Sequence, residues 1–186
     1  MRIIAGEYKG RKIATPEDTS VRPTTGKVKE AIFAMLMNDI YDAVTVDLFA
    51  GTGNLGLEAL SRGARKCYFG DNSRDSLRLI KENIAHCKAE DKSVIIAGSY
   101  EKVLDRIKEK ADIILLDPPY KEGLMLKCLQ RINELDILAN KGVIVAEHGG
   151  YENLPEEIGS ITRVKEKRYG TINVTIYRKG NSNLQL

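Results

Sequence analysis

The middle of the chain alternates between short apolar runs and longer segments in which apolar residues recur with a helical period. The runs are rich in Val, Ile, Leu and Phe without clean alternation, which is typical of strands buried on both faces of a parallel sheet. We expect five such strands, at residues 45–49, 66–69, 93–97, 112–116 and 142–146. Four helices are expected between them, at residues 55–62, 75–87, 100–109 and 124–133. This order predicts an α/β fold with a mostly parallel sheet covered by helices.

The first part of the chain, before this alternation begins, has its own pattern. Residues 2–5 and 12–14 flank a turn that contains glycine, which predicts a small β-hairpin. An Arg-Pro-Thr-Thr stretch then opens a helix, and we expect Thr24 or Thr25 to cap its N-terminus. The apolar residues of this helix recur with the period of a core-facing surface, and they are Val28, Ala31, Ile32, Met35 and Leu36.

The last part of the chain alternates apolar and polar residues. Residues 161–166 and 171–177 show this pattern, which predicts an antiparallel strand pair with one face in water. Together with the central strands, this pair gives a mostly parallel seven-stranded sheet with an antiparallel C-terminal edge. We expect three parts, which are an N-terminal hairpin extension over residues 1–25, an α/β domain over residues 26–180 and a flexible tail over residues 181–186.

Composition supports a single ordinary domain, because 186 residues with 42% hydrophobic content suffice for one core. The three cysteines are odd in number and widely spaced, which argues against a disulfide framework and against a zinc site, so we expect no bound metal. The N-terminus lacks the apolar core of a signal peptide, and no apolar run approaches the roughly 20 residues that span a bilayer. We therefore expect a reduced, cytoplasmic protein with no membrane partner.

A glycine-rich turn separates the first central strand from the helix that follows. Gly51, Gly53 and Gly56 let the backbone turn sharply and approach a ligand, while free helix N–H groups point into the same space. Asp71 ends the second strand, where a carboxylate can accept both hydroxyls of a ribose. This combination indicates a cofactor that contains a nucleoside.

Three interpretations of the turn compete. The Gly-x-Gly-x-x-Gly spacing also matches the dinucleotide fingerprint, so a nicotinamide enzyme is one alternative, and a tight turn without a ligand is another. Asp47, inside the first strand, favours S-adenosylmethionine. An acidic residue beside the turn attracts the ammonium group of that cofactor and would repel a pyrophosphate.

The fourth central strand runs directly into a rigid corner, Asp117-Pro118-Pro119-Tyr120. Two successive prolines fix φ and remove two N–H donors, which leaves acceptors in excess. A bound amino group can donate to the Asp117 carboxylate and to the Pro118 carbonyl, while a base can stack on the Tyr120 ring. Methylation of an exocyclic amine requires such acceptors, because they orient the nitrogen and stabilise its developing charge. The alternative is a strand that ends in a purely structural Pro-Pro turn.

Other polar side chains fit no catalytic arrangement. His86 and His148 belong to no metal-ligand or triad pattern, and we expect both to be surface or helix residues. Asn83 is expected on the polar side of its helix, in a structural role. Cysteine chemistry on a pyrimidine carbon needs an activated thiolate, and no Pro-Cys pair or comparable loop is present.

The net charge is only +3, but the positive charge gathers at the two ends of the chain. Residues 1–30 contain seven basic and four acidic side chains, and residues 163–179 contain six basic and one acidic side chain. Such clusters suit the phosphate backbone of a nucleic acid, although a basic run can also be a merely solvated surface.

With both motifs placed, the chain resembles the RsmD family of bacterial methyltransferases, which modify the guanine N2 amino group at one site, guanine-966, of 16S ribosomal RNA. The resemblance covers most of the chain, at residues 2–6, 10–11, 22–24, 47–53, 55–64, 117–120 and 169–170. It implies a Rossmann-like class I methyltransferase fold with S-adenosylmethionine as cofactor. The implied partner is 16S rRNA in the small ribosomal subunit or in its assembly intermediate.

The resemblance and the motifs together assign roles to three sets of residues. The amine would be held by the catalytic corner, at Asp117, Pro118 and Tyr120. The cofactor would lie on Asp47, Phe49, Ala50, Gly51, Thr52, Gly53, Asn54, Asp71, Asn72, Ser99 and Tyr100. RNA would contact Arg2, Lys9, Arg11, Lys12, Arg22, Lys27 and Arg168.

Two departures from the family pattern concern contacts more than chemistry. Gly26 and Lys27 stand where similar proteins have an Asp-Arg pair, which removes a carboxylate suited to a helix N-terminus and replaces a planar guanidinium with a point charge. Ser99 stands near the place of an Asp and accepts a weaker hydrogen bond from an adenine amino group.

Two functional alternatives stay open. The same corner serves guanine N2 and adenine N6, so an adenine methyltransferase of RNA or DNA is one alternative. The other, from a different class, is a non-catalytic RNA-binding factor in ribosome assembly that uses the fold as a scaffold.

Overall fold

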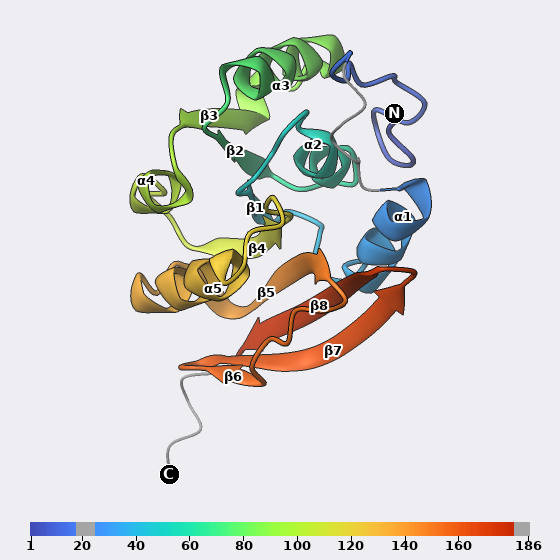
Figure 1. Ribbon diagram of the computed structural model, residues 1–186. Helices are drawn as coiled ribbons and strands as arrows, with labels where there is room; N and C mark the ends of the chain where they lie inside the picture. The colour runs from blue at the N-terminus through green and yellow to red at the C-terminus, as the bar shows by residue number, and fades with distance from the viewer. Residues whose placement is uncertain (18–24, 181–186) are drawn as a thin grey trace.

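The computed structural model describes residues 1–17 and 25–180, which form an α/β structure around one eight-stranded sheet (Figure 1). The strands are β1 (Val44–Asp47), β2 (Lys66–Asp71), β3 (Ser93–Ala97), β4 (Ala111–Leu116), β5 (Leu138–Gly149), β6 (Glu157–Ile158), β7 (Ile161–Tyr169) and β8 (Ile172–Lys179). The helices are α1 (Gly26–Met35), α2 (Asn54–Ser61), α3 (Arg74–Cys87), α4 (Tyr100–Asp105) and α5 (Leu124–Glu134), with a short 3-10 helix at Glu90–Lys92.

The strands lie across the sheet in the order β3-β2-β1-β4-β5-β8-β7-β6. The first five run parallel, and β8, β7 and β6 continue the sheet through antiparallel pairs. The expected mostly parallel sheet with an antiparallel C-terminal edge is confirmed. The sheet contains one strand more than the seven expected, because the two-residue β6 pairs with the start of β7. A strand of that length is too short to leave a period in the sequence.

Helices cover both faces of the sheet, and successive residues of the central strands face opposite layers (Figure 1). Ile113 and Leu115 of β4 pack in the cluster to which α1, α2 and α3 contribute. Ile114 and Leu116 pack in the second cluster, to which α4 and α5 contribute. This two-sided burial explains why the central strands are continuous apolar runs.

The elements end near the expected residues, with two informative exceptions. β5 continues past residue 146 to Gly149, because it pairs with β8 as far as Ile172. α4 ends at Asp105 although its pattern predicts a helix to residue 109. Glu109 leaves the helix and accepts hydrogen bonds from the side chains of Lys66 and Tyr68 on β2, at 2.5 and 2.8 Å.

The extension of β5 corrects one expectation about histidine. His148 is neither a surface nor a helix residue, because it lies in β5 with only 1% of its surface exposed. Its Nε2 lies 2.8 Å from Thr175 Oγ1 on β8, and its Nδ1 lies 3.1 Å from the Gly149 carbonyl. His86 is exposed on α3, as expected.

The N-terminal segment, defined here as residues 1–17, packs along α2. The expected hairpin forms one antiparallel bridge, between Arg2 and Lys12, and backbone hydrogen bonds such as that from the Ile3 amide to the Arg11 carbonyl at 3.0 Å also join its arms. Gly6 has a φ of 84°, and a Cβ there would lie 1.8 Å from the carbonyl oxygen of Ser61. The Ser61 carbonyl and hydroxyl accept hydrogen bonds from the amides of Glu7 and Tyr8, at 2.8 and 2.9 Å. Only glycine permits so close an approach of the two backbones.

The start of α1 confirms one of the two expected caps. Thr25 Oγ1 accepts a hydrogen bond from the Val28 amide at 3.4 Å, whereas Thr24 and residues 181–186 lie outside the described residues. The division of the chain into an extension, a domain and a tail therefore stays a prediction. Within residues 1–17 and 25–180, no helix combines the length and the apolar character needed to cross a membrane.

Candidate functional site

The glycine turn lies at the carboxyl end of β1, at the edge where open α/β sheets bind ligands. Gly53 precedes α2 with a φ of 80°, a left-handed conformation that side chains other than glycine adopt only under strain. Gly56, in the first turn of α2, lies against β2, where a Cβ would come within 2.3 Å of the Phe69 ring and 2.7 Å of Cys67 Sγ. The turn thus needs glycine for two separate reasons, backbone conformation and close helix-to-sheet packing.

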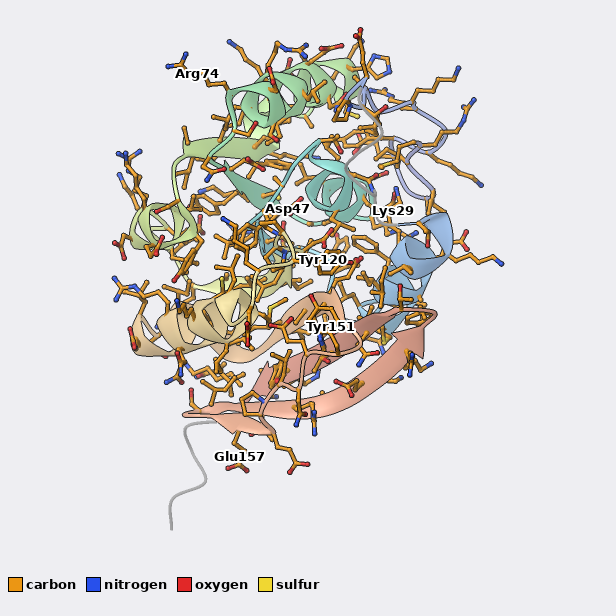
Figure 2. The ribbon with its side chains drawn as sticks, in the orientation of Figure 1. Lys29, Asp47, Arg74, Tyr120, Tyr151 and Glu157 are labelled. Carbon is orange, nitrogen blue, oxygen red and sulfur yellow. The ribbon has the colours of Figure 1, made fainter. Side chains whose placement is uncertain are left out.

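Asp47, the last residue of β1, contacts the first turn of the helix that follows the glycine turn; it is labelled in Figure 2. Its side chain is 1% exposed, and its Oδ2 accepts a hydrogen bond from the Gly56 amide at 2.9 Å. Burial raises the pKa of Asp47 to about 7, and the nearby carboxylates of Asp117 and Asp71 act in the same direction. The hydrogen bond between Asp47 and Gly56 joins β1 to α2 and is a structural contact. The binding of a ligand ammonium by Asp47 stays a prediction.

Asp71 joins the end of β2 to the same turn. Its Oδ2 accepts a hydrogen bond from the Gly51 amide and its Oδ1 accepts one from the Ser73 amide, both at 2.9 Å. Each carboxylate oxygen has a second lone pair with which it can accept another hydrogen bond. Asn72, the next residue, is exposed.

Residues after β1 and after β3 complete the predicted cofactor surface. The rings of Phe49, which follows β1, and Tyr100, which opens α4 after β3, lie 6.4 Å apart at 37°. Ser99 is exposed at the start of α4, and its hydroxyl makes no cap hydrogen bond to that helix. Ala50 and Gly53 are buried, whereas Thr52 is half-buried. The ends of β1, β2 and β3 thus bring the predicted residues to one edge.

The Asp-Pro-Pro-Tyr corner follows β4, which lies directly beside β1 in the sheet. Asp117 is half-buried, Pro118 is buried and Tyr120 is 57% exposed. The turn closes with a hydrogen bond from the Lys121 amide to the Pro119 carbonyl at 2.7 Å. The register of β1 and β4 pairs Asp47 with Leu115, two residues before Asp117, so the corner and the turn leave the sheet side by side; Figure 2 labels Tyr120 and Asp47.

The predicted RNA-binding residues occupy two places. Lys9, Lys12 and Lys27 are exposed, as are Arg2 and Arg168, whereas Arg22 lies outside the described residues. The register places Arg168 at the carboxyl edge, since Arg168 pairs with Asn173 of β8, which in turn pairs with His148 near the end of β5.

Arg11, another predicted RNA contact, makes two contacts within the protein. Its guanidinium donates to the His86 carbonyl at 3.0 Å and lies 5.4 Å from the centre of the Tyr8 ring. It is half-buried.

Burial governs the chemistry of the three cysteines. All three cysteines are buried and free, and burial raises the pKa of each thiol, to about 12 for Cys128. None is an activated thiolate. In the part of the chain that the structure describes, no three side chains of His, Cys, Asp or Glu group as metal ligands would.

Two buried polar side chains beside the glycine turn were not predicted from the sequence. Asn83, expected on the polar side of α3, is instead 1% exposed and donates to the Thr52 carbonyl at 2.9 Å. Lys29, counted only as a charge, is 1% exposed and donates to Asn54 Oδ1 at 2.8 Å. The one available signal was a polar residue at a core position of each helix. Lys29 lies three and four residues before Ile32 and Phe33, and Asn83 lies three and four residues after Ile80 and Leu79.

Comparison with known proteins finds relatives along the whole chain. The profile of a family described as "Conserved hypothetical protein 95" matches residues 1–178. "Putative rRNA methyltransferase YlbH" of Bacillus subtilis is 38% identical over 182 residues, 96% of this chain and 99% of that protein. "Ribosomal RNA small subunit methyltransferase D" of Escherichia coli K12 is 31% identical over 179 residues, 96% of this chain and 90% of that protein. The solved structure titled "Putative methyltransferase yhhF from Escherichia coli" superposes with a TM-score of 0.88 at 29% identity, over 97% of this chain and 98% of that one.

Proposed function

Because the chain belongs to the RsmD family of methyltransferases, whose profile carries the description "Conserved hypothetical protein 95", we propose that it methylates the N2 amino group of guanine-966 in 16S rRNA. The methyl donor is S-adenosylmethionine, and the substrate is the small ribosomal subunit or its assembly intermediate. The observation that carries the proposal is the meeting of two motifs at one sheet edge, the glycine turn after β1 and the acceptor-rich corner after the adjacent β4.

The acidic character of this edge suits the proposed cofactor. S-adenosylmethionine supplies an electrophilic methyl on a cationic sulfonium and carries an ammonium group. Besides burial, the carboxylates of Asp117 and Asp71 raise the pKa of Asp47. A cationic ligand would relieve the repulsion among these three carboxylates. A pyrophosphate would add to that repulsion, which disfavours the nicotinamide alternative. Asp71 would accept the ribose hydroxyls, and the pair Phe49 and Tyr100 would flank the adenine.

The corner supplies what the amine needs. Asp117 and the Pro118 carbonyl accept hydrogen bonds from the two N–H groups of an exocyclic amine, and Tyr120 stacks on the ring of its base. An amine paired inside a helix cannot reach this position, so the base must be unpaired or extruded. The remaining catalytic work is alignment of the nitrogen with the methyl, which requires neither a metal nor a covalent intermediate.

The basic residues suit the proposed RNA. Lys9, Lys12 and Lys27 lie toward the N-terminus. Arg168 lies on β7, in register with residues near the end of β5. Such dispersed positive charges hold phosphates and position a strand without reading its sequence.

A direct transfer assay tests the function and separates its alternatives. The protein is incubated with labelled S-adenosylmethionine and small ribosomal subunits from a strain that lacks the enzyme, and the modified nucleotide is mapped. We expect label on guanine N2. Label on adenine N6 supports the adenine alternative, and tight binding of the subunit without any transfer supports the scaffold alternative.

A further inference from the structure

Lys29 on α1 bridges the N-terminal segment and the glycine turn. Its buried ammonium donates to the Arg2 carbonyl at 2.7 Å and to Asn54 Oδ1 at 2.8 Å, and it forms an ion pair with Glu58 Oε2 at 2.8 Å. An ammonium has three N–H donors, so all of them are used. Arg2 belongs to the N-terminal segment, and Asn54 is the first residue of α2, directly after the turn. One side chain therefore contacts both elements.

Glu58 strengthens this bridge on the side of the N-terminal segment. Its carboxylate, 0% exposed, accepts hydrogen bonds from the amides of Ile4 and Ala5, at 2.9 and 3.1 Å, and from Arg62 Nε at 2.9 Å. A buried ion pair is costly to desolvate and is weak evidence for stability alone, so specific placement of its neighbours is a better account of its presence.

Asn83 on α3 forms a second bridge between the same two elements. Its Nδ2 donates to the Ala14 carbonyl at 3.0 Å and to the Thr52 carbonyl at 2.9 Å, and its Oδ1 accepts from the Ala14 amide at 2.8 Å. Ala14 lies near the far end of the N-terminal segment, and Thr52 lies in the middle of the glycine turn. The two bridges come from different helices and hold opposite ends of the segment.

We propose that Lys29 and Asn83 are positioning residues that make the N-terminal segment and the glycine turn one cooperative unit, so that cofactor binding and RNA binding strengthen each other. The inference rests on the proposed function, because it takes the turn as the cofactor site and the segment as part of the RNA surface. A cofactor that fixes the turn also fixes Thr52 and Asn54, and through them the segment, so RNA then binds an element that is already ordered. By linkage, RNA strengthens cofactor binding by the same factor.

Hydrogen exchange of the full chain tests the first half of this inference, with S-adenosylhomocysteine as the probe. In the wild type, the ligand should slow exchange of the Ile4, Ala5 and Ala14 amides roughly 5-fold or more, although these amides lie outside the turn. In Asn54→Ala, which keeps the Lys29–Glu58 ion pair, the effect should vanish at Ile4 and Ala5 at a ligand concentration that calorimetry shows to saturate the variant. In Asn83→Leu it should vanish at Ala14.

A matched control separates this coupling from a general loss of stability. Asn133 holds Ser160 in the same way, through its Oδ1 at 3.0 Å from the Ser160 amide, but connects α5 with the β6–β7 turn. Asn133→Leu should keep the full effect of the ligand on all three amides. If the wild type shows no slowing there, or if both bridge variants keep it in full, the inference is wrong.

Affinity for small ribosomal subunits lacking the modification tests the second half. At concentrations that saturate each protein, S-adenosylhomocysteine should tighten binding of the wild type roughly 5-fold or more, and the Asn54→Ala/Asn83→Leu double variant should show no tightening. Equal tightening in both proteins overturns the inference while the proposed function stands. Calorimetry that detects no binding of S-adenosylhomocysteine overturns the proposed function itself, and the inference with it.

Discussion

The Oδ2 atom of Asp71 accepts a hydrogen bond from the backbone amide of Gly51 at 2.9 Å, so the end of β2 holds the start of the glycine turn. Asp71→Ala removes both this support and the proposed acceptor for the ribose. We expect S-adenosylhomocysteine binding to weaken by about 1–3 kcal/mol, the cost of losing a charge-assisted hydrogen bond. Calorimetry measures the change, with exposed Asp75→Ala as the control. Tight NAD binding with no response to S-adenosylhomocysteine would contradict the cofactor assignment.

Asp117→Ala should affect methyl transfer far more than cofactor binding. Loss of one positioned acceptor should lower the single-turnover rate roughly 10²–10³-fold at saturating cofactor, while affinity for S-adenosylhomocysteine changes little. Asp105→Ala, which removes an exposed ion pair with Arg131, should leave the rate unchanged. A wild-type rate in Asp117→Ala would make the corner purely structural.

Tyr120 should act through its ring. Tyr120→Phe keeps the stacking face and should be mild, whereas Tyr120→Ala should lose about 1–3 kcal/mol of stacking with the base. The ratio of kcat/KM between the variants and the wild type reports this loss. Tyr41→Ala, which truncates a tyrosine that is 86% exposed, is the control. Equal kcat/KM for Tyr120→Phe and Tyr120→Ala would show that the ring does not stack on substrate.

Asp47 should make stability depend on pH in the direction opposite to most carboxylates. Its native pKa of about 7 lies above its ordinary value of 3.8, so between these values the folded protein binds more protons than the unfolded chain. The free energy of unfolding should therefore fall as the pH rises from about 4 to about 7, by at most about 4 kcal/mol.

Urea unfolding of wild type and Asp47→Asn across this pH range measures that contribution. As the pH rises, the unfolding free energy of the wild type should fall relative to that of Asp47→Asn. The difference between the two proteins should become constant above about pH 8. A difference that does not vary with pH would show that Asp47 titrates at its ordinary value.

Lys12 should contribute one phosphate contact. Lys12→Ala should reduce the slope of log affinity against log salt for the small subunit by about one. Lys108→Ala, which removes an exposed lysine after α4, should leave the slope unchanged. An unchanged slope in Lys12→Ala would mark that charge as solvated surface.

The sequence predicts much of the fold and the strand ends at the site, because those features follow from local chemistry. The apolar runs give the central strands, and the Asp-Pro-Pro-Tyr corner is rigid by composition alone. The bridges formed by Lys29 and Asn83 cannot be predicted from local sequence patterns, because they join residues that are far apart in the chain, such as Asn83 and Ala14. His148 was misplaced for a similar reason, since the length of β5 depends on its pairing with β8.

The two-residue β6 has a consequence for the protein in solution. Beyond Ile161 and Thr162, which β6 pairs, residues 164–169 of β7 form an open edge in the described structure. Val164, 55% exposed, is followed there by exposed Lys165 and Lys167. Lysines on an open edge oppose docking of a second strand, because each new strand would bury their charges. These lysines of the basic C-terminal run thus oppose the joining of separate copies of the protein into a continuous sheet.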